Sequence, residues 1–436
     1  MSGQKEFQRR RRELMGMIGA NGIAVLAAAP ERVRSRDTLF IYRPDSDFYY
    51  LTGFPEPEAV AVLVPGRPQG EFLLFCRERN PERELWDGPR AGPEGAVAAF
   101  GADDGYPIDD LDDILPGLLE RSDRVYYSIG KNEFDQKLLA FIQTLNSKRQ
   151  SSHAPSEIVA LDHLLHEMRL FKSRGEAGTM RRSARIAVAA HTRAMQAARP
   201  GMIEYELEAE FLHEFRRHGA DCSYPPIVAA GANACVLHYR ANDATLCDGD
   251  LVLIDAGCEL QMYASDVTRT FPVNGVFSKP QRELYDVVLA ANRAATKVAQ
   301  VGNHWNDPHD AAVGEVTRGL KDLGLLSGRV HHLIKTQAYR QFFMHRTGHW
   351  LGLDVHDVGD YKVAEHWRLL EPGMVMTIEP GVYVSANDKS VDKRWRGIGI
   401  RIEDDVQVTR NGPDVLTKGV PTTVAEIERH MNGREA

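Results

Sequence analysis

The stretch that most constrains the fold is an apolar run, Leu251 to Ile254, which ends on an acidic residue, Asp255. Four consecutive branched apolar side chains predict a short strand with buried faces. Ala256-Gly257 then breaks the strand, and a second β-like stretch carries Asp266, eleven positions after Asp255. This spacing allows a strand end, a tight connection and a return strand, so both carboxylates can lie side by side on a hairpin.

Two carboxylates at the ends of buried strands need a counter-charge. An unpaired carboxylate is costly to bury, and two that lie close together repel each other. A metal cation between Asp255 and Asp266 is the simplest solution. The alternative is that the two acids cap turns or pair with Arg269, and the hairpin by itself leaves both interpretations open.

Further segments carry the residue types of a catalytic or metal site. They hold His238 after a glycine-containing loop, His345, His349 and His356 within sixteen residues, Glu379 before Pro-Gly, and Arg401 with Glu403. Residues 397–405 alternate strictly, which predicts one strand with Arg401 and Glu403 on the same face. Each segment also has a plainer interpretation, such as a hydrogen-bonded histidine, a turn glutamate or an Arg401–Glu403 ion pair. Together they supply acids and an imidazole at separate strand ends, which suits a pair of divalent ions such as Mn²⁺ or Co²⁺ rather than a thiolate zinc site.

Length and composition restrict the class of protein. A chain of 436 residues is too long for one ordinary core, so we expect two domains, residues 1–172 and 173–436. A net charge of −8 argues against a nucleic-acid partner. No apolar run approaches the roughly 20 residues that span a bilayer, and the N-terminus lacks the pattern of a secretory signal. Five scattered cysteines without a C-x-x-C pair predict reduced thiols in a cytoplasmic protein.

Hydrophobic periodicity predicts different secondary structure in the two parts. Residues 1–172 have α/β character, with strands expected at 23–28, 59–64, 71–76 and 125–129 and helices at 114–121 and 135–145. The aromatic-rich residues 45–54 are expected to form a packed loop, and residues 84–90 an exposed turn. In residues 173–436, helices are expected at 176–200, 204–218, 281–301 and 309–323. Each helix pair is followed by strands, which suggests a duplication around a central sheet.

The motifs together resemble the metallopeptidase family with the pita-bread fold, which comprises methionine aminopeptidase, prolidase and aminopeptidase P. The likeness spans residues 172–415 and is carried by Ile-Asp-Ala-Gly-Cys-Glu, Ser-Asp-Val-Thr-Arg-Thr, His-Trp-Leu-Gly-Leu-Asp-Val-His, Ile-Glu-Pro-Gly and Gly-Ile-Arg-Ile-Glu. Residues 46–54 and 58–64 resemble the extra N-terminal domain that methionine aminopeptidases lack. The resemblance implies an α/β N-terminal domain plus an α+β pita-bread C-terminal domain, with a central curved antiparallel sheet flanked by two helix pairs.

The resemblance also implies roles for individual residues. The metal ligands would be Asp255, Asp266, His349, Glu379 and Glu403, holding two divalent ions, with Mn²⁺ preferred and Co²⁺ or Zn²⁺ as alternatives. Glu379 would also act as general base, and His356 would stabilise the oxyanion. His238 and His345 would line the pocket on the proline side, and Arg401 would orient Glu403 or Asp266.

The implied reaction is the hydrolysis, by a hydroxide that bridges the ions, of the bond between an N-terminal residue and a following proline. The expected partners are peptides with proline in second position and other copies of the chain, in a homodimer or homotetramer. Neither nucleic acid nor a membrane is expected. Two alternatives stay open: a prolidase that cuts only Xaa-Pro dipeptides, and a metal-free binding module on the same fold. Arg346-Thr347 and Pro225-Pro226 depart from the commonest family strings, which concerns the shape of the pocket rather than its chemistry.

Overall fold

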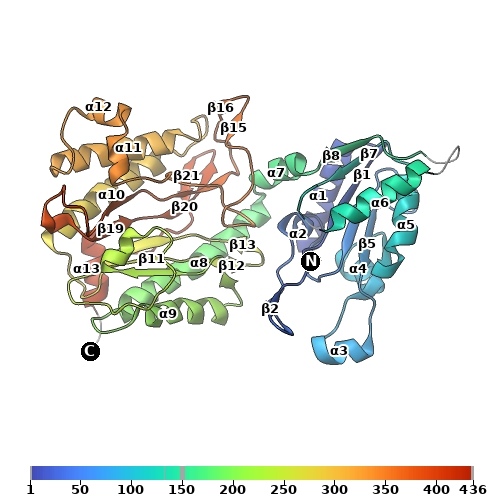
Figure 1. The fold of residues 1–436 in the computed structure, drawn as a ribbon, viewed down its shortest axis with the longest axis horizontal. Helices are drawn as coiled ribbons and strands as arrows, with labels where there is room; N and C mark the ends of the chain where they lie inside the picture. Colours follow the sequence, from blue (N-terminus) through green and yellow to red (C-terminus); the bar gives the residue numbers. More distant parts are fainter. Residues whose placement is uncertain (1, 132, 148–152, 434–436) are drawn as a thin grey trace. The chain divides into compact units, whose positions relative to one another are not determined.

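The computed structural model describes residues 2–131, 133–147 and 153–433. The chain divides into two compact units, residues 1–168 and 169–436 (Figure 1). Over the described ranges, none of the helices combines the length and the apolar character that a membrane span requires.

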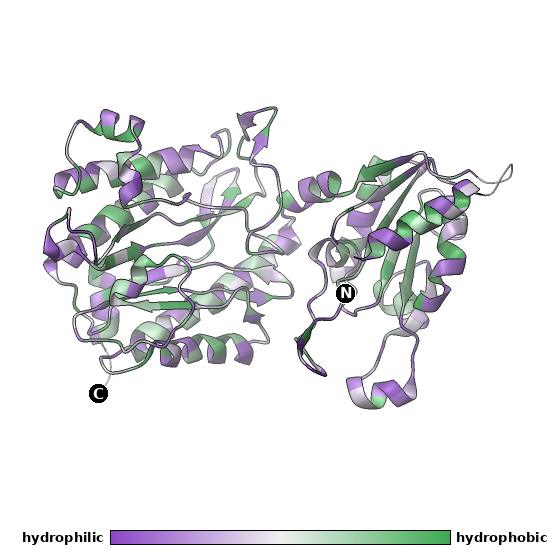
Figure 2. Ribbon diagram, viewed as in Figure 1, coloured by the Kyte–Doolittle hydropathy of each residue, from purple (hydrophilic) through white to green (hydrophobic). Residues whose placement is uncertain are grey.

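The first unit contains a six-stranded mixed sheet with the order β6-β5-β4-β1-β7-β8. Its strands are β1 (Gly22–Ala27), β4 (Val60–Leu63), β5 (Phe72–Cys76), β6 (Asp104–Pro107), β7 (Arg124–Tyr127) and β8 (Glu157–Ala160). β1 lies parallel to β7 and antiparallel to β4. The central strands β1, β4 and β5 are almost entirely buried, as expected for continuous apolar runs, and they appear hydrophobic in Figure 2. The mixed sheet agrees with the α/β prediction.

Seven helices accompany this sheet in the described part of the unit. They are α1 (Ser2–Ile18), α2 (Ser46–Thr52), α3 (Pro81–Asp87), α4 (Gly92–Phe100), α5 (Leu111–Leu119), α6 (Phe134–Ser147) and α7 (Asp162–Leu170), the last of which runs into the second unit. A short exposed ribbon, β2 (Val33–Ser35) and β3 (Thr38–Leu39), stands apart from the sheet. Helices α5 and α6 pack on one face of the sheet through Leu115, Leu119 and Leu138.

Two segments of this unit differ from the prediction, because helix caps outweigh their apparent loop composition. Residues 45–54 contain the buried helix α2, whose N-cap Asp45 accepts a hydrogen bond from the backbone N–H of Phe48 and whose C-cap Gly53 is left-handed. Residues 84–90 fall largely in helix α3, capped by Asn80, rather than in a turn. Trp86 of α3 is 84% exposed.

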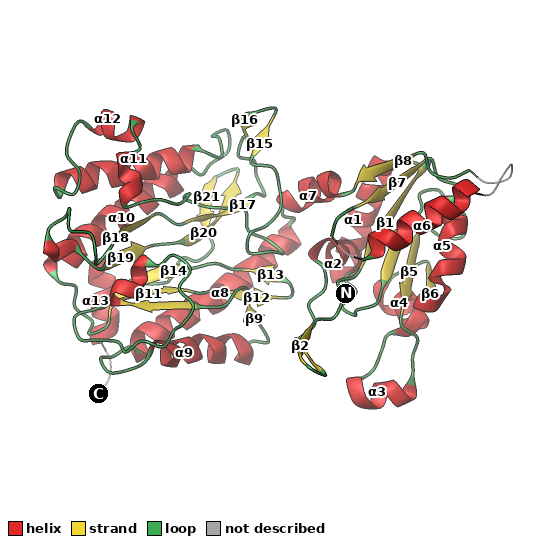
Figure 3. Cartoon of the chain, in the orientation of Figure 1, coloured by secondary structure: helices red, strands yellow, loops and turns green. Residues whose placement is uncertain are grey.

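The second unit contains two long helix pairs and antiparallel strands (Figure 3). The helices are α8 (Arg174–Ala197), α9 (Glu204–Arg217), α10 (Lys279–Val298), α11 (Asp307–Asp322), α12 (Val330–Lys335) and α13 (Val424–Asn432). Helix α8 packs on α9, and α10 on α11. A capping box between Ser173 and Glu176 fixes the start of α8. Buried aromatic residues from several elements, including Phe211, Tyr285 and Trp350, join one core.

The strands of this unit are divided among several small sheets, and the central curved antiparallel sheet stays a prediction. Two three-stranded sheets have the orders β10-β11-β14 and β13-β12-β9, a third is β17-β20-β21, and β18-β19 and β15-β16 are two-stranded. Their bounds are β9 (Asp221–Cys222), β10 (Ile227–Ala230), β11 (Leu251–Asp255), β12 (Cys258–Leu260), β13 (Tyr263–Ala264), β14 (Thr268–Pro272), β15 (Lys362–Val363), β16 (His366–Trp367), β17 (Val375–Ile378), β18 (Gly381–Val384), β19 (Ile398–Arg401), β20 (Asp404–Thr409) and β21 (Gly412–Val415).

The ladders are interrupted where the expected site residues lie. The single strand predicted for residues 397–405 is divided into β19, which pairs with β18, and β20, which pairs with β17. Glu403 lies in the break. Its backbone N–H donates to the carbonyl oxygen of Thr268, the first residue of β14, at 3.0 Å. The hydroxyl of Thr270 likewise donates to the Arg401 carbonyl oxygen at 3.0 Å. Hydrogen bonds outside the regular ladders therefore join the small sheets at this point.

Candidate metal centre

The two aspartates lie together on a hairpin, as predicted. β11 and β14 are antiparallel, and Asp255 is opposite Thr268, two residues after Asp266. The connection between them is the narrow β12–β13 ribbon. Gly257 permits the close approach of its two ends, because a Cβ there would lie 1.7 Å from the carbonyl oxygen of Ser265.

Two glutamates reach the same place from other strands. Glu379 directly follows β17, and its backbone N–H donates to the Thr347 carbonyl oxygen at 2.8 Å. Glu403 accepts a hydrogen bond from the Thr268 hydroxyl at 2.6 Å, which holds its carboxylate beside β14. Glu379 and Asp255 are thus positioned in the same way, each at the end of an apolar strand.

His349 supplies the imidazole of the cluster. Its Nδ1 lies 2.9 Å from the backbone oxygen of Trp350, so the Nδ1–H donates there and Nε2 is directed toward the acids. The Nε2 atom is 3.4 Å from Oδ2 of Asp266 and 3.7 Å from Oε1 of Glu379. One ligand atom from each of Asp266, His349 and Glu403 lies within 4.8 Å of the others.

Arg401 lies between Asp255 and Thr268. Its Nη2 donates to Oδ2 of Asp255 at 2.6 Å and its Nε to the Thr268 hydroxyl at 3.1 Å. Its role in orienting Glu403 or Asp266 stays a prediction: it reaches Glu403 through the Thr268 hydroxyl, and its only ion pair among the described residues is with Asp255. The reason is the register of β19, which sets the guanidinium beside the end of β11. Interactions with Tyr383 and then with Asp255 outweigh burial and raise the pKa of Arg401.

Two tyrosines in the site were missed by sequence reasoning. The hydroxyl of Tyr224 is in hydrogen-bond contact with Asp255, at 2.6 Å, and with Asp266. The hydroxyl of Tyr383 accepts from Arg401 at 3.0 Å and lies 2.9 Å from Nε2 of His345. A signal existed for Tyr383 alone, because it follows Glu379 closely on an alternating apolar strand. Tyr224 lies in a loop whose sequence gives no such indication.

Burial and mutual repulsion shift the protonation of the acids. Burial, followed by the charges of Asp266 and Glu379, raises the pKa of Glu403 well above its ordinary value. Burial raises the pKa of Glu379 to about 7, against the opposing charges of His349 and Arg401. The pKa of Asp266 is also raised by burial, although its hydrogen bond with His349 works the other way. The pKa of His349 rises to about 9, because Asp266 and Glu379 outweigh burial.

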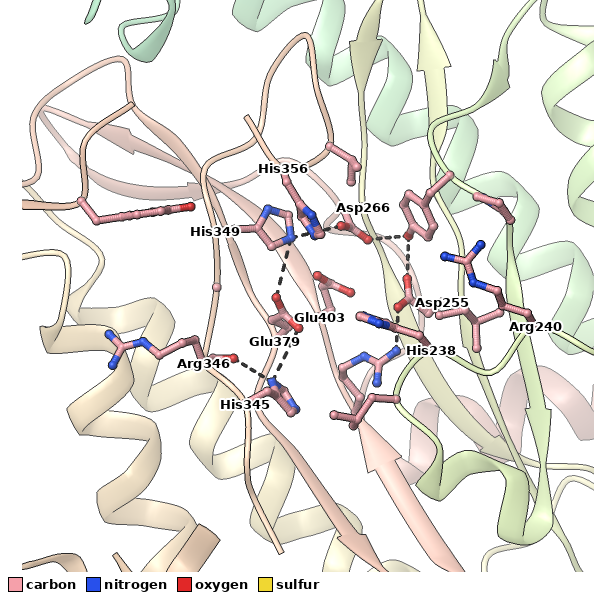
Figure 4. A pocket seen from close by; sticks show the side chains of 18 residues that line it. His238, Arg240, Asp255, Asp266, His345, Arg346, His349, His356, Glu379 and Glu403 are labelled. Atoms are coloured by element: carbon pink, nitrogen blue, oxygen red, sulfur yellow. Dashed lines mark hydrogen bonds and ion pairs between the residues drawn. The ribbon is translucent and has the colours of Figure 1, made fainter. Parts of the chain in front are cut away.

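All the site residues predicted from the sequence line one cavity of about 530 Å³ (Figure 4). They are Asp255, Asp266, His349, Glu379, Glu403, His238, His345, His356 and Arg401. The ring centroid of His356 is 4.4 Å from that of His349. Burial and the neighbouring His349 and His238 lower the pKa of His356, so that it stays neutral near pH 7.

The donor set fits divalent cations. Four carboxylates converge, and only Asp255 has an arginine partner among the described residues. The raised pKa values of Asp266, Glu379 and Glu403 show that their charges are not balanced by the protein. Oxygen ligands with one imidazole suit hard or borderline divalent metals, and no cysteine lines the cavity.

The fold and the acidic centre define a class of protein, the metal-dependent peptidases. The chain belongs to metallopeptidase family M24, whose model matches residues 178–410, and residues 7–126 match the model of the aminopeptidase P N-terminal domain. The Xaa-Pro aminopeptidase of Escherichia coli K12 is 45% identical over 432 residues, which cover 98% of both chains.

Solved structures agree with this assignment. The structure of Pseudomonas aeruginosa aminopeptidase PepP is similar with a TM-score of 0.98 and 59% identity, covering 99% of this chain and 98% of that one. Aminopeptidase P from E. coli with the inhibitor Pro-Leu is similar with a TM-score of 0.96 and 44% identity, covering 99% and 98%. The two-domain organisation of the aminopeptidase P fold is thereby established for this chain.

Proposed function

We propose that this protein is a metal-dependent Xaa-Pro aminopeptidase, which hydrolyses the bond between an N-terminal residue and a following proline. The observation that carries the proposal is the convergence of Asp255, Asp266, His349, Glu379 and Glu403 in one cavity. The similarity to Xaa-Pro aminopeptidases over nearly the whole chain supports the substrate class. The complete donor set disfavours a metal-free binding module.

The proposed metal complement is two divalent ions, Mn²⁺ in preference to Co²⁺ or Zn²⁺, held by those five residues. Such ions lower the pKa of a bound water and polarise a peptide carbonyl group. Arg401 and Tyr224 hold Asp255 from two sides, through hydrogen bonds of 2.6 Å each, and thus keep its carboxylate oriented toward the centre.

Glu379 is the proposed general base. It lies in the cavity with Oε1 3.7 Å from Nε2 of His349, where it can take a proton from water and pass it on to the leaving proline nitrogen. His356 stays neutral because burial lowers its pKa, so a ring N–H remains to donate to the developing oxyanion.

A wall suited to proline lies beside these groups. Burial lowers the pKa of His345 to about 4, so the ring is neutral, and it packs edge-on to Phe343 with centroids 5.1 Å apart. His238, on the exposed loop before β11, is proposed to face the peptide from the other side. An Xaa-Pro bond has no N–H, so a site that acts on the carbonyl and holds the ring by shape does not require one.

The wider proposal follows from the same assignment. We propose that residues 1–172 form the N-terminal domain of this enzyme type and residues 173–436 its pita-bread catalytic domain. A homodimer or homotetramer is proposed, supported by Leu85 and Trp86 of α3, whose apolar side chains are more than 80% exposed. A cytoplasmic location is supported by five cysteines that are all free thiols.

The decisive experiment combines metal analysis with an assay. Protein purified without chelator should hold two divalent ions per chain, cleave Xaa-Pro-Xaa tripeptides and lose activity with EDTA. Glu379→Ala should abolish turnover, whereas Glu371→Ala, an exposed acid outside the cavity, should not. Cleavage of Xaa-Pro dipeptides alone would identify a prolidase. A metal-free protein insensitive to chelator, or an active Glu379→Ala variant, would contradict the proposal.

A further inference from the structure

Arg346 lies at one end of the cavity, and its direct contacts are with neutral groups; the nearest acid that acts on its charge, Asp310, lies behind Asn306. The guanidinium donates through Nη2 to the side-chain oxygen of Asn306 at 2.5 Å. It also lies over the ring of Trp367, with 5.1 Å from Cζ to the ring centroid. Both partners are neutral, and among the described residues no carboxylate is within ion-pair distance of the guanidinium. A cation that neutral contacts hold in place is preorganised for an anion from solution.

The two contacts that hold Arg346 are themselves fixed. Asn306 directly precedes α11, and its amide nitrogen donates to Asp310 at 2.7 Å, which leaves its oxygen for the guanidinium. Trp367 ends strand β16 of the β15–β16 hairpin. Partial burial lowers the pKa of Arg346, but a guanidinium remains charged at any physiological pH. The site therefore presents a permanent, partly desolvated positive charge.

A second arginine of the same cavity provides a contrast. Arg240 lines the opposite end, and Figure 4 shows His238 and Asp255 on its side and His345 on the side of Arg346. Both arginines are exposed, but no hydrogen bond or ion pair is found for the side chain of Arg240 within the described ranges. It carries the same charge without a fixed position, which makes it the matched control for Arg346.

The charges of the cavity suit a short peptide whose N-terminus lies at the acids and whose C-terminus lies toward Arg346. The acids of the metal centre attract the cationic N-terminus of a peptide, whose opposite end is an anion. Arg346 lies on the outer side of His345, the proposed wall for proline. One further residue extends a chain by about 3.3–3.6 Å, so the carboxylate of a third residue lies beyond the proline, toward the side of Arg346.

We propose that Arg346 binds the C-terminal carboxylate of Xaa-Pro-Xaa tripeptides, so that short peptides with a free carboxylate are the preferred substrate class. The inference rests on the proposed function, and it assigns Arg346 a role in specificity rather than in the chemical step. A guanidinium pairs with a carboxylate through two parallel hydrogen bonds, so lysine is a poor replacement. The contact is equally strong before and during the reaction, so it should lower KM and leave kcat unchanged.

The test is a cycle of two substrates and two proteins. The metal-loaded enzyme is assayed on an Xaa-Pro-Xaa tripeptide and on its C-terminal amide, as the original protein and as Arg346→Gln. We expect kcat/KM to favour the free acid by about tenfold at low salt, an ordinary effect for a partly exposed charged hydrogen bond. In Arg346→Gln the preference should disappear through a higher KM for the acid. In the original protein, a higher salt concentration should reduce the preference for the free acid over the amide.

The controls separate this inference from its alternatives. Arg240→Gln should keep the preference, and Arg346→Lys should keep only part of it. Unchanged thermal unfolding of Arg346→Gln would exclude a folding defect. Equal cleavage of acid and amide by the original protein, or a preference that survives in Arg346→Gln, would overturn the role of Arg346 while leaving the peptidase intact. If neither substrate is cleaved, the proposed function itself fails.

Discussion

Two groups of buried carboxylates in residues 169–436 are balanced in opposite ways. Asp357 accepts hydrogen bonds from Arg169 at 2.5 Å and from Lys172 at 2.8 Å, and all three side chains are at most 2% exposed. Although burial acts to raise the pKa of Asp357, the charges of Lys172 and Arg169 lower it below its ordinary value. In the metal centre, burial and neighbouring acids raise the pKa values of Asp266 and Glu403.

The difference separates a structural use of buried charge from a functional one. Around Asp357 the protein supplies its own cations, so the group is complete when the chain folds. In the metal centre, acids gather without enough cations among the described residues, so folding is opposed there unless a cation from solution binds. The proposed metal site thus lowers the stability of the metal-free protein. Substitutions in the two groups should therefore have opposite effects on folding and activity.

The largest effect is expected from Glu403→Gln. Glu403 is a proposed metal ligand, and a metal ion supplies several kcal/mol of transition-state stabilisation, so activity should fall about a thousandfold or more. The metal-free protein should nevertheless unfold at a higher temperature at pH 7. The folded pKa of Glu403 is raised, so its charged form opposes folding above the unfolded pKa, and glutamine removes that charge while still accepting from Thr268. Peptide hydrolysis and thermal unfolding in EDTA measure the two effects.

Added Mn²⁺ provides the internal control for this variant. The original protein should gain unfolding temperature with the ion, and Glu403→Gln should gain less. If the variant is less stable than the original in EDTA, the acids of the centre do not oppose folding, and the contrast with Asp357 is lost.

A smaller effect, and one on stability, is expected from Asp357→Asn. The substitution leaves Lys172 buried without its carboxylate, which should lower the free energy of unfolding by about 3–5 kcal/mol. Asp354→Asn is the matched control, because Asp354 also pairs with Arg169 but is 35% exposed, and it should cost less than about 1 kcal/mol. Urea unfolding with metal saturated gives both values. A cost for Asp357→Asn as small as that of Asp354→Asn would show that this group is no structural ion pair.

Local sequence signals predicted the acids of the cavity but not the breaks between its strands. Asp255 and Glu379 each follow an apolar run, and strand ends are visible in a single segment of sequence. The break at Glu403 was not predictable, because alternation continues through it and only contact with Thr268 of β14 reveals it. The helix at 46–52 was predictable from its caps, Asp45 and Gly53, which aromatic composition obscured.

Contacts between distant segments account for what the sequence could not predict in the site. Tyr224 reaches Asp255 and Asp266 from a loop more than thirty positions earlier in the chain. Arg401 was identified, yet its partner Asp255 follows from strand register rather than from any local pattern. Residue types therefore predicted which groups line the cavity, whereas packing decides how they are paired.

The smallest expected effect is on the pH dependence of stability, and it comes from His191, which is buried beneath the acids. This histidine of α8 is 0% exposed, and its Nε2 lies 3.1 Å from the carbonyl oxygen of Ala256, directly after Asp255. Burial lowers its pKa from 6.5 to about 4, so the fold holds the neutral ring. The neutral ring stabilises the folded state fully above the unfolded pKa of the histidine. This stabilisation is lost as the pH falls from about 6.5 toward 4. Between pH 7 and 5 the loss should be about 2 kcal/mol.

The effect of His191 is measured as a difference in pH dependence. In EDTA, urea unfolding of His191→Gln should lose less stability between pH 7 and 5 than the original protein, although the variant starts from a lower value. The acids of the centre titrate alike in both proteins, so the comparison isolates the histidine. His213→Gln, at an exposed position of α9, should retain the original slope. Equal slopes for the original and His191→Gln would mean that water or a counter-charge reaches the core beneath Asp255. The raised pKa values of the acids would then come from their mutual repulsion more than from burial.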